Sequence, residues 1–281
     1  MTSADTGLFQ RLEWFYDALP RTSARAEDIG GLVLFVREGA GWPFYARPRP
    51  DVDGTPSAAD ITAARARQRD LGVPEAFEWV HENSPDLLAV ARSAGLAVLE
   101  APLMVLDPSA LPPASELSDV SVRLLDPHAP SFADDVAVVR AVAEVGFGTP
   151  GTDSGEPGPA ERDAAVVALD EAEATEERRK AVSKQRITAL AETAGDGALA
   201  SGVGMRTGDV VEIAGVATLP TARRKGLGAA VTAAIARRAL DDGADVVFLA
   251  AGSEDIARVY VRVGFRRIGT ACIAEPAPVP A

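Results

Sequence analysis

The stretch TLPTARRKGLGAAVTAAIARRAL (218–240) places three consecutive cations beside two glycines and then continues as a long alanine-rich run. Residues 209–219 are apolar enough for a strand, and residues 226–243 have a helical pattern that ends at Gly243. The sequence therefore predicts a strand, a loop and a helix in that order. A glycine-rich loop in this context presents unpaired backbone N–H groups and the positive end of the helix dipole at one point, which favours a bound anion.

The glycine spacing of this loop narrows the kind of anion site. A nucleotide-triphosphate P-loop requires Gly-x-x-x-x-Gly-Lys-Ser/Thr, which the loop lacks. A dinucleotide fingerprint requires Gly-x-Gly-x-x-Gly, but Val231 stands at the third glycine position. The loop instead fits Arg-x-x-Gly-x-Gly, formed by Arg223, Gly226 and Gly228, with Pro220 three residues earlier.

The segments around the loop alternate between strand and helix patterns, with turn signals at AGDG and RTGD that predict an antiparallel meander. The expected elements are a strand at 120–126, a helix at 131–148 with Ser131 as its N-cap, helical residues at 160–184, strands near 186–193, 198–206 and 209–219, the helix after the loop, a strand at 245–250, a helix at 253–264 and a strand at 265–275.

With the loop in this context, the sequence resembles the Gcn5-related N-acetyltransferase (GNAT) superfamily, whose acetyl-coenzyme A loop has the form Arg/Gln-x-x-Gly-x-Gly/Ala between a strand and a helix. A second family signature, roughly Asn-x-x-Ala-x-x-Leu-Tyr-x-x-x-Gly-Phe, is similar to SEDIARVYVRVGF (253–265) at Val259, Tyr260, Gly264 and Phe265. The resemblance implies an α/β (α+β) fold built on the mixed central sheet of acyl-CoA N-acyltransferases.

Two positions depart from the second signature, since Ser253 replaces the usual Asn and Ile256 the usual Ala. The resemblance extends over residues 120–275. It implies that acetyl-CoA is bound by Val216, Ala217, Thr218, Arg223, Arg224, Lys225, Gly226, Leu227, Gly228, Ala229 and Ser253. The backbone of the first three would hold the pantetheine arm as an added strand, with Gly215 suited to a local bulge.

The resemblance also implies two catalytic side chains. Tyr260 would protonate or stabilise the departing thiolate, although a tyrosine on an amphipathic helix can equally be part of the core. Glu212 would deprotonate the incoming amine, although a lone carboxylate in an apolar strand can equally face solvent. The single cysteine, Cys272, lies away from both motifs, so we expect direct attack without an acyl-enzyme.

The first part of the chain resembles the second. SPDLLAVARSAGL (84–96) aligns without gaps with residues 253–265, but Ala91 takes the place of Tyr260. In place of the glycine loop stands TPSAADITAA (55–64), which has neither the glycines nor the arginine. We therefore expect a partial repeat of the same fold that lacks the catalytic groups.

These observations predict two domains in a tandem arrangement like that of actinobacterial acetyltransferases. The N-terminal domain would either close one wall of the substrate cleft or only stabilise its neighbour. The expected segments are a degenerate GNAT-like domain at 1–106, a proline-rich linker at 107–119, a catalytic GNAT domain at 120–275 and a C-terminal tail at 276–281.

Composition limits the function further. The net charge of −13, from 41 acidic and 28 basic side chains, argues against a nucleic-acid binder. One cysteine and two histidines give no basis for a metal site. Since no apolar run approaches the ~20 residues of a membrane span, we expect a soluble, cytoplasmic protein with no membrane partner.

The sequence as a whole predicts an N-acetyltransferase that moves an acetyl group from acetyl-CoA to a primary amine on a small molecule or a peptide. Two alternatives remain open: a non-catalytic acyl-CoA sensor, and an enzyme that transfers a different acyl group. The oligomeric state is also open, between a monomer and a homodimer.

Overall fold

The computed structural model describes residues 3–39, 44–113, 117, 119–149 and 151–278, which form two compact units. Unit 1 comprises the chain up to Leu103, Ala250–Gly252 and the segment from Arg267 onward; unit 2 comprises Met104–Leu249 and Ser253–Arg266. Most of the last strand therefore lies in unit 1, whereas the sequence analysis assigned it to the second domain. Of the expected linker, residues 114–116 and 118 lie outside the described residues.

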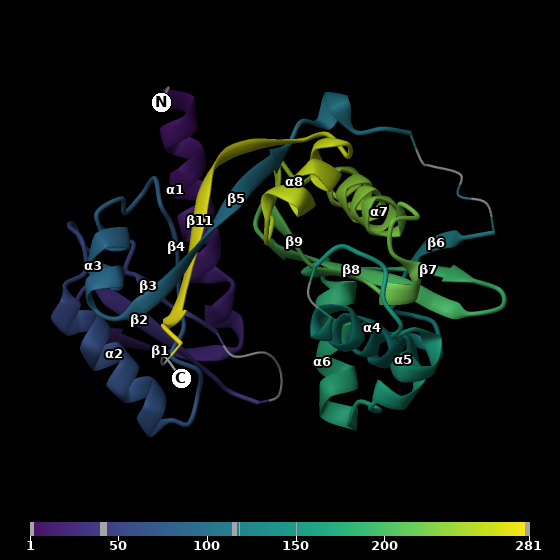
Figure 1. Cartoon of the computed structure of the whole chain (residues 1–281), viewed down its shortest axis with the longest axis horizontal. Helices are drawn as coiled ribbons and strands as arrows, with labels where there is room; N and C mark the ends of the chain where they lie inside the picture. The colour runs from purple at the N-terminus through teal and green to yellow at the C-terminus, as the bar shows by residue number, and fades with distance from the viewer. Residues whose placement is uncertain (1–2, 40–43, 114–116, 118, 150, 279–281) are drawn as a thin grey trace. The chain divides into compact units, whose positions relative to one another are not determined.

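Unit 1 is built on a sheet with the strand order β1-β2-β3-β4-β11-β5 (Figure 1). β1, β2 and β3 pair antiparallel, β3 and β4 pair parallel, and β11 pairs antiparallel with β4. Its elements are α1 Ser3–Ala18, η1 Pro20–Thr22, β1 Ala24–Ile29, β2 Leu32–Arg37, β3 Ala46–Pro48, α2 Ala58–Asp70, β4 Phe77–Val80, α3 Leu87–Ser93, β5 Leu96–Leu106 and β11 Phe265–Pro276, the last two of which extend into unit 2.

The two faces of this sheet differ in chemistry. Ala46 of β3 and Phe77 of β4 pack into an apolar core with α2 and α3. Their neighbours Arg47 and Glu78 point to the opposite face, because side chains alternate along a strand. There Arg47 donates hydrogen bonds to Glu78 at 2.9 Å and to Glu13 of α1 at 3.3 Å. The α1 face of unit 1 is thus closed over a buried ionic cluster.

Unit 2 follows the order of elements expected for residues 120–275, and the α/β fold with a mixed sheet is confirmed. Its strand order is β5-β10-β9-β8-β7-β6, in which the predicted meander β7-β8-β9 is antiparallel. The elements are η2 Pro108–Ala110, β6 Ser121–Leu124, α4 Phe132–Gly148, α5 Pro159–Ala165, α6 Glu171–Val182, β7 Arg186–Thr193, β8 Gly197–Thr207, β9 Val210–Thr218, η3 Pro220–Ala222, α7 Leu227–Asp241, β10 Val246–Ala250 and α8 Glu254–Val261.

The helices α4 and α7 lie on opposite faces of the unit 2 sheet (Figure 1). A Cβ on Gly204 of β8 would meet Ile235 of α7 at 2.8 Å, whereas the hydroxyl of Ser201 donates to a backbone carbonyl of α4 at 3.3 Å. Met205 shares the face of Ser201 and is paired with Glu212 of β9. The side chain of Glu212 is therefore on the α4 face.

The helical stretch expected at 160–184 is two helices in the structure, so that prediction is wrong in its continuity. α5 ends before Val166 and Val167, whose branched side chains disfavour a helix. A new helix then begins at a capping box, in which Asp170 accepts from the Glu173 amide at 2.8 Å and Glu173 accepts from the Asp170 amide at 3.2 Å.

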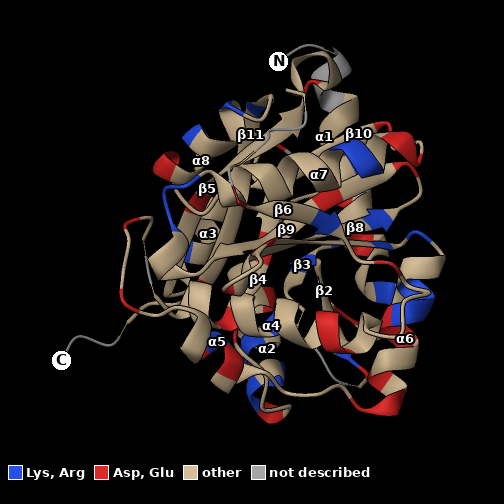
Figure 2. Cartoon of the chain, turned by 90° about the vertical axis from the view of Figure 1, so that its right-hand side faces the viewer, with Lys and Arg blue, Asp and Glu red and all other residues tan. Residues whose placement is uncertain are grey.

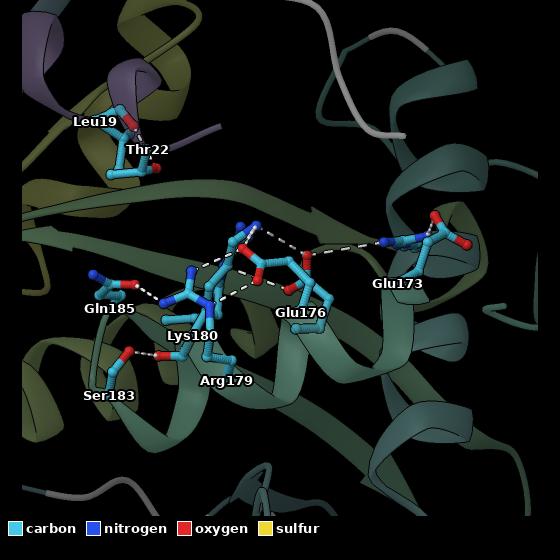
Figure 3. A network of polar contacts seen from close by, with 11 residues as sticks. Leu19, Thr22, Glu173, Glu176, Arg179, Lys180, Ser183 and Gln185 are labelled. Atoms are coloured by element: carbon cyan, nitrogen blue, oxygen red, sulfur yellow. Dashed lines mark hydrogen bonds and ion pairs between the residues drawn. The ribbon is translucent and has the colours of Figure 1, made fainter. Parts of the chain in front are cut away.

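α6 has no buried side chain and is held by ion pairs (Figure 3), with charges of both signs along its length (Figure 2). The Glu177 carboxylate lies 3.7 Å from the Lys180 ammonium, 3.8 Å from the guanidinium of Arg186 on β7 and 3.9 Å from that of Arg140 on α4. Arg140 also donates to Glu173 at 3.0 Å. Electrostatic contacts thus connect α6 to a helix and to a strand of its unit.

Candidate functional site

All the residues that the sequence analysis singled out as catalytic or cofactor-binding lie in unit 2. β9 carries the first group of them and contains the expected bulge. Ser201 of β8 pairs with Ala217, but Val203 pairs with Ala214, so β9 has one more residue than its partner between these pairs. Gly215 lies in this bulge with φ +60°, a left-handed conformation that suits glycine. The prediction of a bulge at Gly215 is confirmed.

Beyond Glu212, β9 has one edge open. β10 pairs with β9 in parallel only from Val246 opposite Val210 to Phe248 opposite Glu212. β9 continues to Thr218, and within the described residues no strand pairs with its β10-side edge after Glu212. Backbone N–H and C=O groups along this edge can accept an extended ligand that carries amide groups, in the manner of an added strand.

The loop after β9 ends in a helix N-terminus without a cap of its own. Arg224 and Gly226 have φ values of +64° and +82°, which turn the chain sharply into α7. The first helical hydrogen bond is donated by the Ala230 amide to the Gly226 carbonyl at 3.0 Å. α7 has no side-chain cap and no acidic residue in its first turn. Its leading amides therefore remain available to an outside anion.

The two glycines of the loop serve different purposes. Gly226 has the left-handed conformation in which a side chain causes strain. Gly228 is the second residue of α7, where an added Cβ would lie 3.5 Å from the Thr218 hydroxyl, an ordinary contact distance. The protein alone does not require glycine at position 228, but a ligand that approaches the backbone closely would.

The three cations of the loop have different environments. Arg224 and Lys225 are exposed, and the Arg224 guanidinium is 3.8 Å from the carboxylate of Asp153. The guanidinium of Arg223 is instead bound within the protein. It donates at 2.7–3.4 Å to the backbone carbonyls of Thr149, Gly146, Asp153 and Thr218.

Tyr260 lies on α8 and is almost completely buried, with 9% of its surface exposed. Its ring packs edge-on against Phe265, with the ring centroids 6.1 Å apart. Burial raises the pKa of the hydroxyl to about 12, so Tyr260 stays protonated at neutral pH. Within the described residues the hydroxyl makes no hydrogen bond. This environment suits a proton donor as well as a core residue.

Glu212 is buried on the central strand of three, between Met205 of β8 and Phe248 of β10. Only 9% of its surface is exposed, so the alternative of a solvent-facing carboxylate is wrong. Burying a carboxylate is costly unless polar groups stabilise it. Glu212 forms the last register pair between β9 and β10, with Phe248, so it marks the point after which the two strands separate.

Ser253 has a local structural role. Its hydroxyl oxygen accepts from the Ile256 amide at 3.3 Å and caps α8. Cys272 is fully buried in unit 1, and burial raises the pKa of its thiol to about 12, which disfavours the nucleophilic thiolate. In the part of the chain that the structure describes, no group of His, Cys, Asp or Glu side chains is arranged for a metal ion, and no helix meets the length and apolarity needed to cross a bilayer.

Sequence reasoning missed Gly146, which lies in the last turn of α4. A Cβ there would be 2.9 Å from the Cβ of Ala217 and 3.3 Å from the Thr218 carbonyl oxygen. A glycine near a helix end has no distinctive sequence signal, because the contact that requires it involves a strand far along the chain.

Comparison with known proteins supports the assignment of the fold. Residues 195–274 match the family model described as FR47-like protein. A GCN5-related N-acetyltransferase from Kribbella flavida has 22% identity and a TM-score of 0.68, over 96% of this chain and 96% of its own. A GCN5-related N-acetyltransferase-like protein from Streptococcus suis has 11% identity and a TM-score of 0.52, over 96% and 98%.

A tandem GNAT protein from the clavulanic acid biosynthesis pathway has 16% identity and a TM-score of 0.52, over 89% of this chain and 79% of its own. No protein with a curated function matches this chain in sequence. The chain therefore has the fold of the Gcn5-related N-acetyltransferases, and its residues 195–274 carry the FR47-like family signature.

Proposed function

We propose that unit 2 is an N-acetyltransferase that moves an acetyl group from acetyl-CoA to a primary amine. One observation carries the proposal: within the described residues no strand pairs with the β10-side edge of β9 after Glu212, and the loop that follows β9 ends at a helix N-terminus without a side-chain cap. The backbone of Val216, Ala217 and Thr218 would pair with the amides of the pantetheine arm. The amides from Arg224 to Ala229 would bind the pyrophosphate, with charge from Arg224 and Lys225.

The reaction needs one proton acceptor and one proton donor. The amine nitrogen attacks the acetyl carbonyl carbon, a C–N bond forms, and the C–S bond breaks. Glu212 takes the proton that the amine must lose, directly or through a water molecule. Tyr260 donates a hydrogen bond or its proton to the departing thiolate, whose conjugate acid has a pKa near ~8.5. Both side chains then recover their original protonation states by exchange with solvent.

Direct attack needs no covalent intermediate on the protein, and the buried Cys272 is unsuited to form one. The acceptor would be an amine on a small molecule or a peptide. The net charge of −13 favours an acceptor that is cationic before it is deprotonated, because opposite charge speeds encounter.

A thermal-shift series with acetyl-, succinyl-, malonyl- and longer acyl-CoA tests the cofactor assignment. A ligand at ~100 times its Kd adds ~2.7 kcal/mol to the free energy of unfolding, which raises the melting temperature measurably. If none of these compounds shifts the transition, the acyl-CoA assignment is wrong. A shift without acetyl transfer to a panel of amines would identify a sensor, and a larger shift with another acyl group would identify a different transferase.

The general base is tested by the variant Glu212→Gln, which keeps the shape of the side chain. We expect kcat/KM to fall. We also expect the limb of its pH profile at low pH, where protonation of the base lowers kcat/KM, to disappear. Arg224→Ala serves as a control, since it should weaken acetyl-CoA binding without changing that limb. An unchanged pH profile in Glu212→Gln would show that another group, or solvent, accepts the proton.

A further inference from the structure

The end of α4 is packed against the part of β9 proposed to hold the pantetheine arm. Gly146 is buried there, and a methyl group in place of its hydrogen would lie 2.9 Å from the Cβ of Ala217. The same methyl group would lie 3.3 Å and 3.5 Å from the carbonyl oxygen and amide nitrogen of Thr218. Contacts below 3.4 Å require the neighbour to move, and here the neighbours include strand backbone.

A second set of contacts connects the same two segments. The guanidinium of Arg223 donates to the Thr149 carbonyl at 2.7 Å, to the Gly146 carbonyl at 2.8 Å and to the Asp153 carbonyl at 3.1 Å. The last carbonyls of a helix have no intrahelical donor and carry the negative end of the helix dipole. Arg223 therefore supplies hydrogen bonds to unpaired carbonyls at the end of α4, and its positive charge offsets the negative end of the helix dipole.

The segment that follows α4 is also bonded to the start of the loop. The Gly155 amide donates to the Pro220 carbonyl at 3.2 Å, and the Thr221 amide donates to the Pro157 carbonyl at 3.1 Å. These bonds and those of Arg223 join residues 146–149 and 153–157 to residues 218–223. We call this set of contacts the α4 clasp.

We propose that the α4 clasp sets the position of the pantetheine-binding strand end and the pyrophosphate loop, with Gly146 and Arg223 as positioning residues. This proposal rests on the function proposed above. It gives Arg223 a role different from that of a phosphate-binding cation, because its fork of N–H groups is already directed at main-chain carbonyls. It also implies that acyl-CoA affinity depends on α4, the helix that covers the face of Glu212.

Two variant pairs test the clasp in the full chain. Gly146→Ala is compared with Gly148→Ala, because an added Cβ at Gly148 meets nothing within 4 Å. Arg223→Lys is compared with Arg206→Lys, because the Arg206 guanidinium also donates to several main-chain carbonyls, those of Gly208, Asp242 and Gly243, away from the loop. In both variants lysine keeps the charge but not the fork that reaches several carbonyls. We expect Gly146→Ala and Arg223→Lys to weaken acetyl-CoA binding by about tenfold or more, which corresponds to ~1.4 kcal/mol, and both controls to change it less than twofold.

Hydrogen–deuterium exchange separates this proposal from the proposed function. We expect faster exchange at the Gly155 and Thr221 amides in ligand-free Arg223→Lys and unchanged exchange at these amides in Arg206→Lys. Wild-type affinity for acetyl-CoA in Gly146→Ala and Arg223→Lys would overturn the clasp. Unchanged exchange at these two amides in Arg223→Lys would also overturn it. A wild-type protein that binds no acyl-CoA, with the expected exchange result, would overturn only the proposed function and its consequence for affinity.

Discussion

Two helices in this chain connect strands in the same way, but their N-termini are capped differently. α2 in unit 1 and α7 in unit 2 each connect two strands that pair in parallel, β3 with β4 and β9 with β10. At α2, the Ser57 hydroxyl accepts from the Asp60 amide at 3.2 Å, and the Asp60 carboxylate accepts from the Ser57 amide at 2.8 Å. At α7, Gly226 supplies no cap. The N-terminus of α2 is thus capped by a carboxylate of the chain itself, whereas α7 has neither a side-chain cap nor an acidic residue in its first turn.

The strands before these helices differ in a related way. Arg47 of β3 and Glu212 of β9 both face away from the helix that follows their strand. Arg47 is paired with Glu78 and Glu13, which close that face beneath α1. Glu212 lies instead where β9 and β10 separate. In unit 1, charges of the chain itself occupy both positions, at the helix N-terminus and beside Arg47, while the order of strand, helix and parallel strand is the same as in unit 2.

The largest effect is expected at Tyr260, whose counterpart in the repeat is the buried Ala91. Tyr260→Phe removes the proton donor and should lower kcat by ~10²-fold or more, with little change in acetyl-CoA affinity. Steady-state kinetics and calorimetric binding measure the two quantities. Ala91→Phe is not a useful control because it would overpack a core, so Val261→Ala, at an exposed neighbour on α8, serves instead. If kcat of Tyr260→Phe equals that of the wild type, Tyr260 has no catalytic role and only packs in the core.

The same tyrosine predicts a dependence of stability on pH. Its folded-state pKa of about 12 exceeds the ordinary value of 10.0, so the folded state holds the proton more tightly than the unfolded state. The protonated hydroxyl therefore adds to the free energy of unfolding. This stabilisation is fully present below about pH 10 and is lost as the pH rises toward 12, by up to ~2.7 kcal/mol. Chemical denaturation across this range should show a smaller loss in Tyr260→Phe than in the wild type. Equal losses would show that the hydroxyl ionises as readily in the folded protein.

Ala229→Asp would give α7 the feature that closes α2, because Ala229 and Asp60 hold the third position of their helices. The new carboxylate should occupy the helix N-terminus and repel pyrophosphate, weakening acetyl-CoA binding by about tenfold or more. Ala229→Asn is the neutral control of similar size. Equal affinities in Asp and Asn variants would indicate that charge at this terminus does not decide binding.

The smallest effect is expected at the closed terminus. Hydrogen bonds from the Ser57 backbone hold the pKa of Asp60 below its ordinary value, and the Ser57 hydroxyl completes the cap. Ser57→Ala should lower the free energy of unfolding by ~1 kcal/mol and leave acetyl-CoA affinity unchanged, as measured by denaturation and calorimetry. A loss of affinity would show that α2 takes part in cofactor binding after all.

Much of unit 2 could be predicted from local sequence. The strand, loop and helix around Gly226 follow from glycine placement and from apolar periodicity, which act over a few residues. The bulge at Gly215 was predictable because a glycine inside a strand favours one. The break between α5 and α6 was not, because their helix-forming composition obscured the capping box at Asp170.

The sequence by itself determined the loop between β9 and α7, the second signature on α8 and the weak repeat in unit 1, because each depends on residues close along the chain. Only the tertiary structure decided that β11 pairs with β4 in unit 1, that Glu212 is buried and that Arg223 is bound to the end of α4. The physical reason is that these outcomes depend on which distant backbone groups meet. These long-range contacts depend on the packing of the whole unit, so they cannot be predicted from a local sequence pattern.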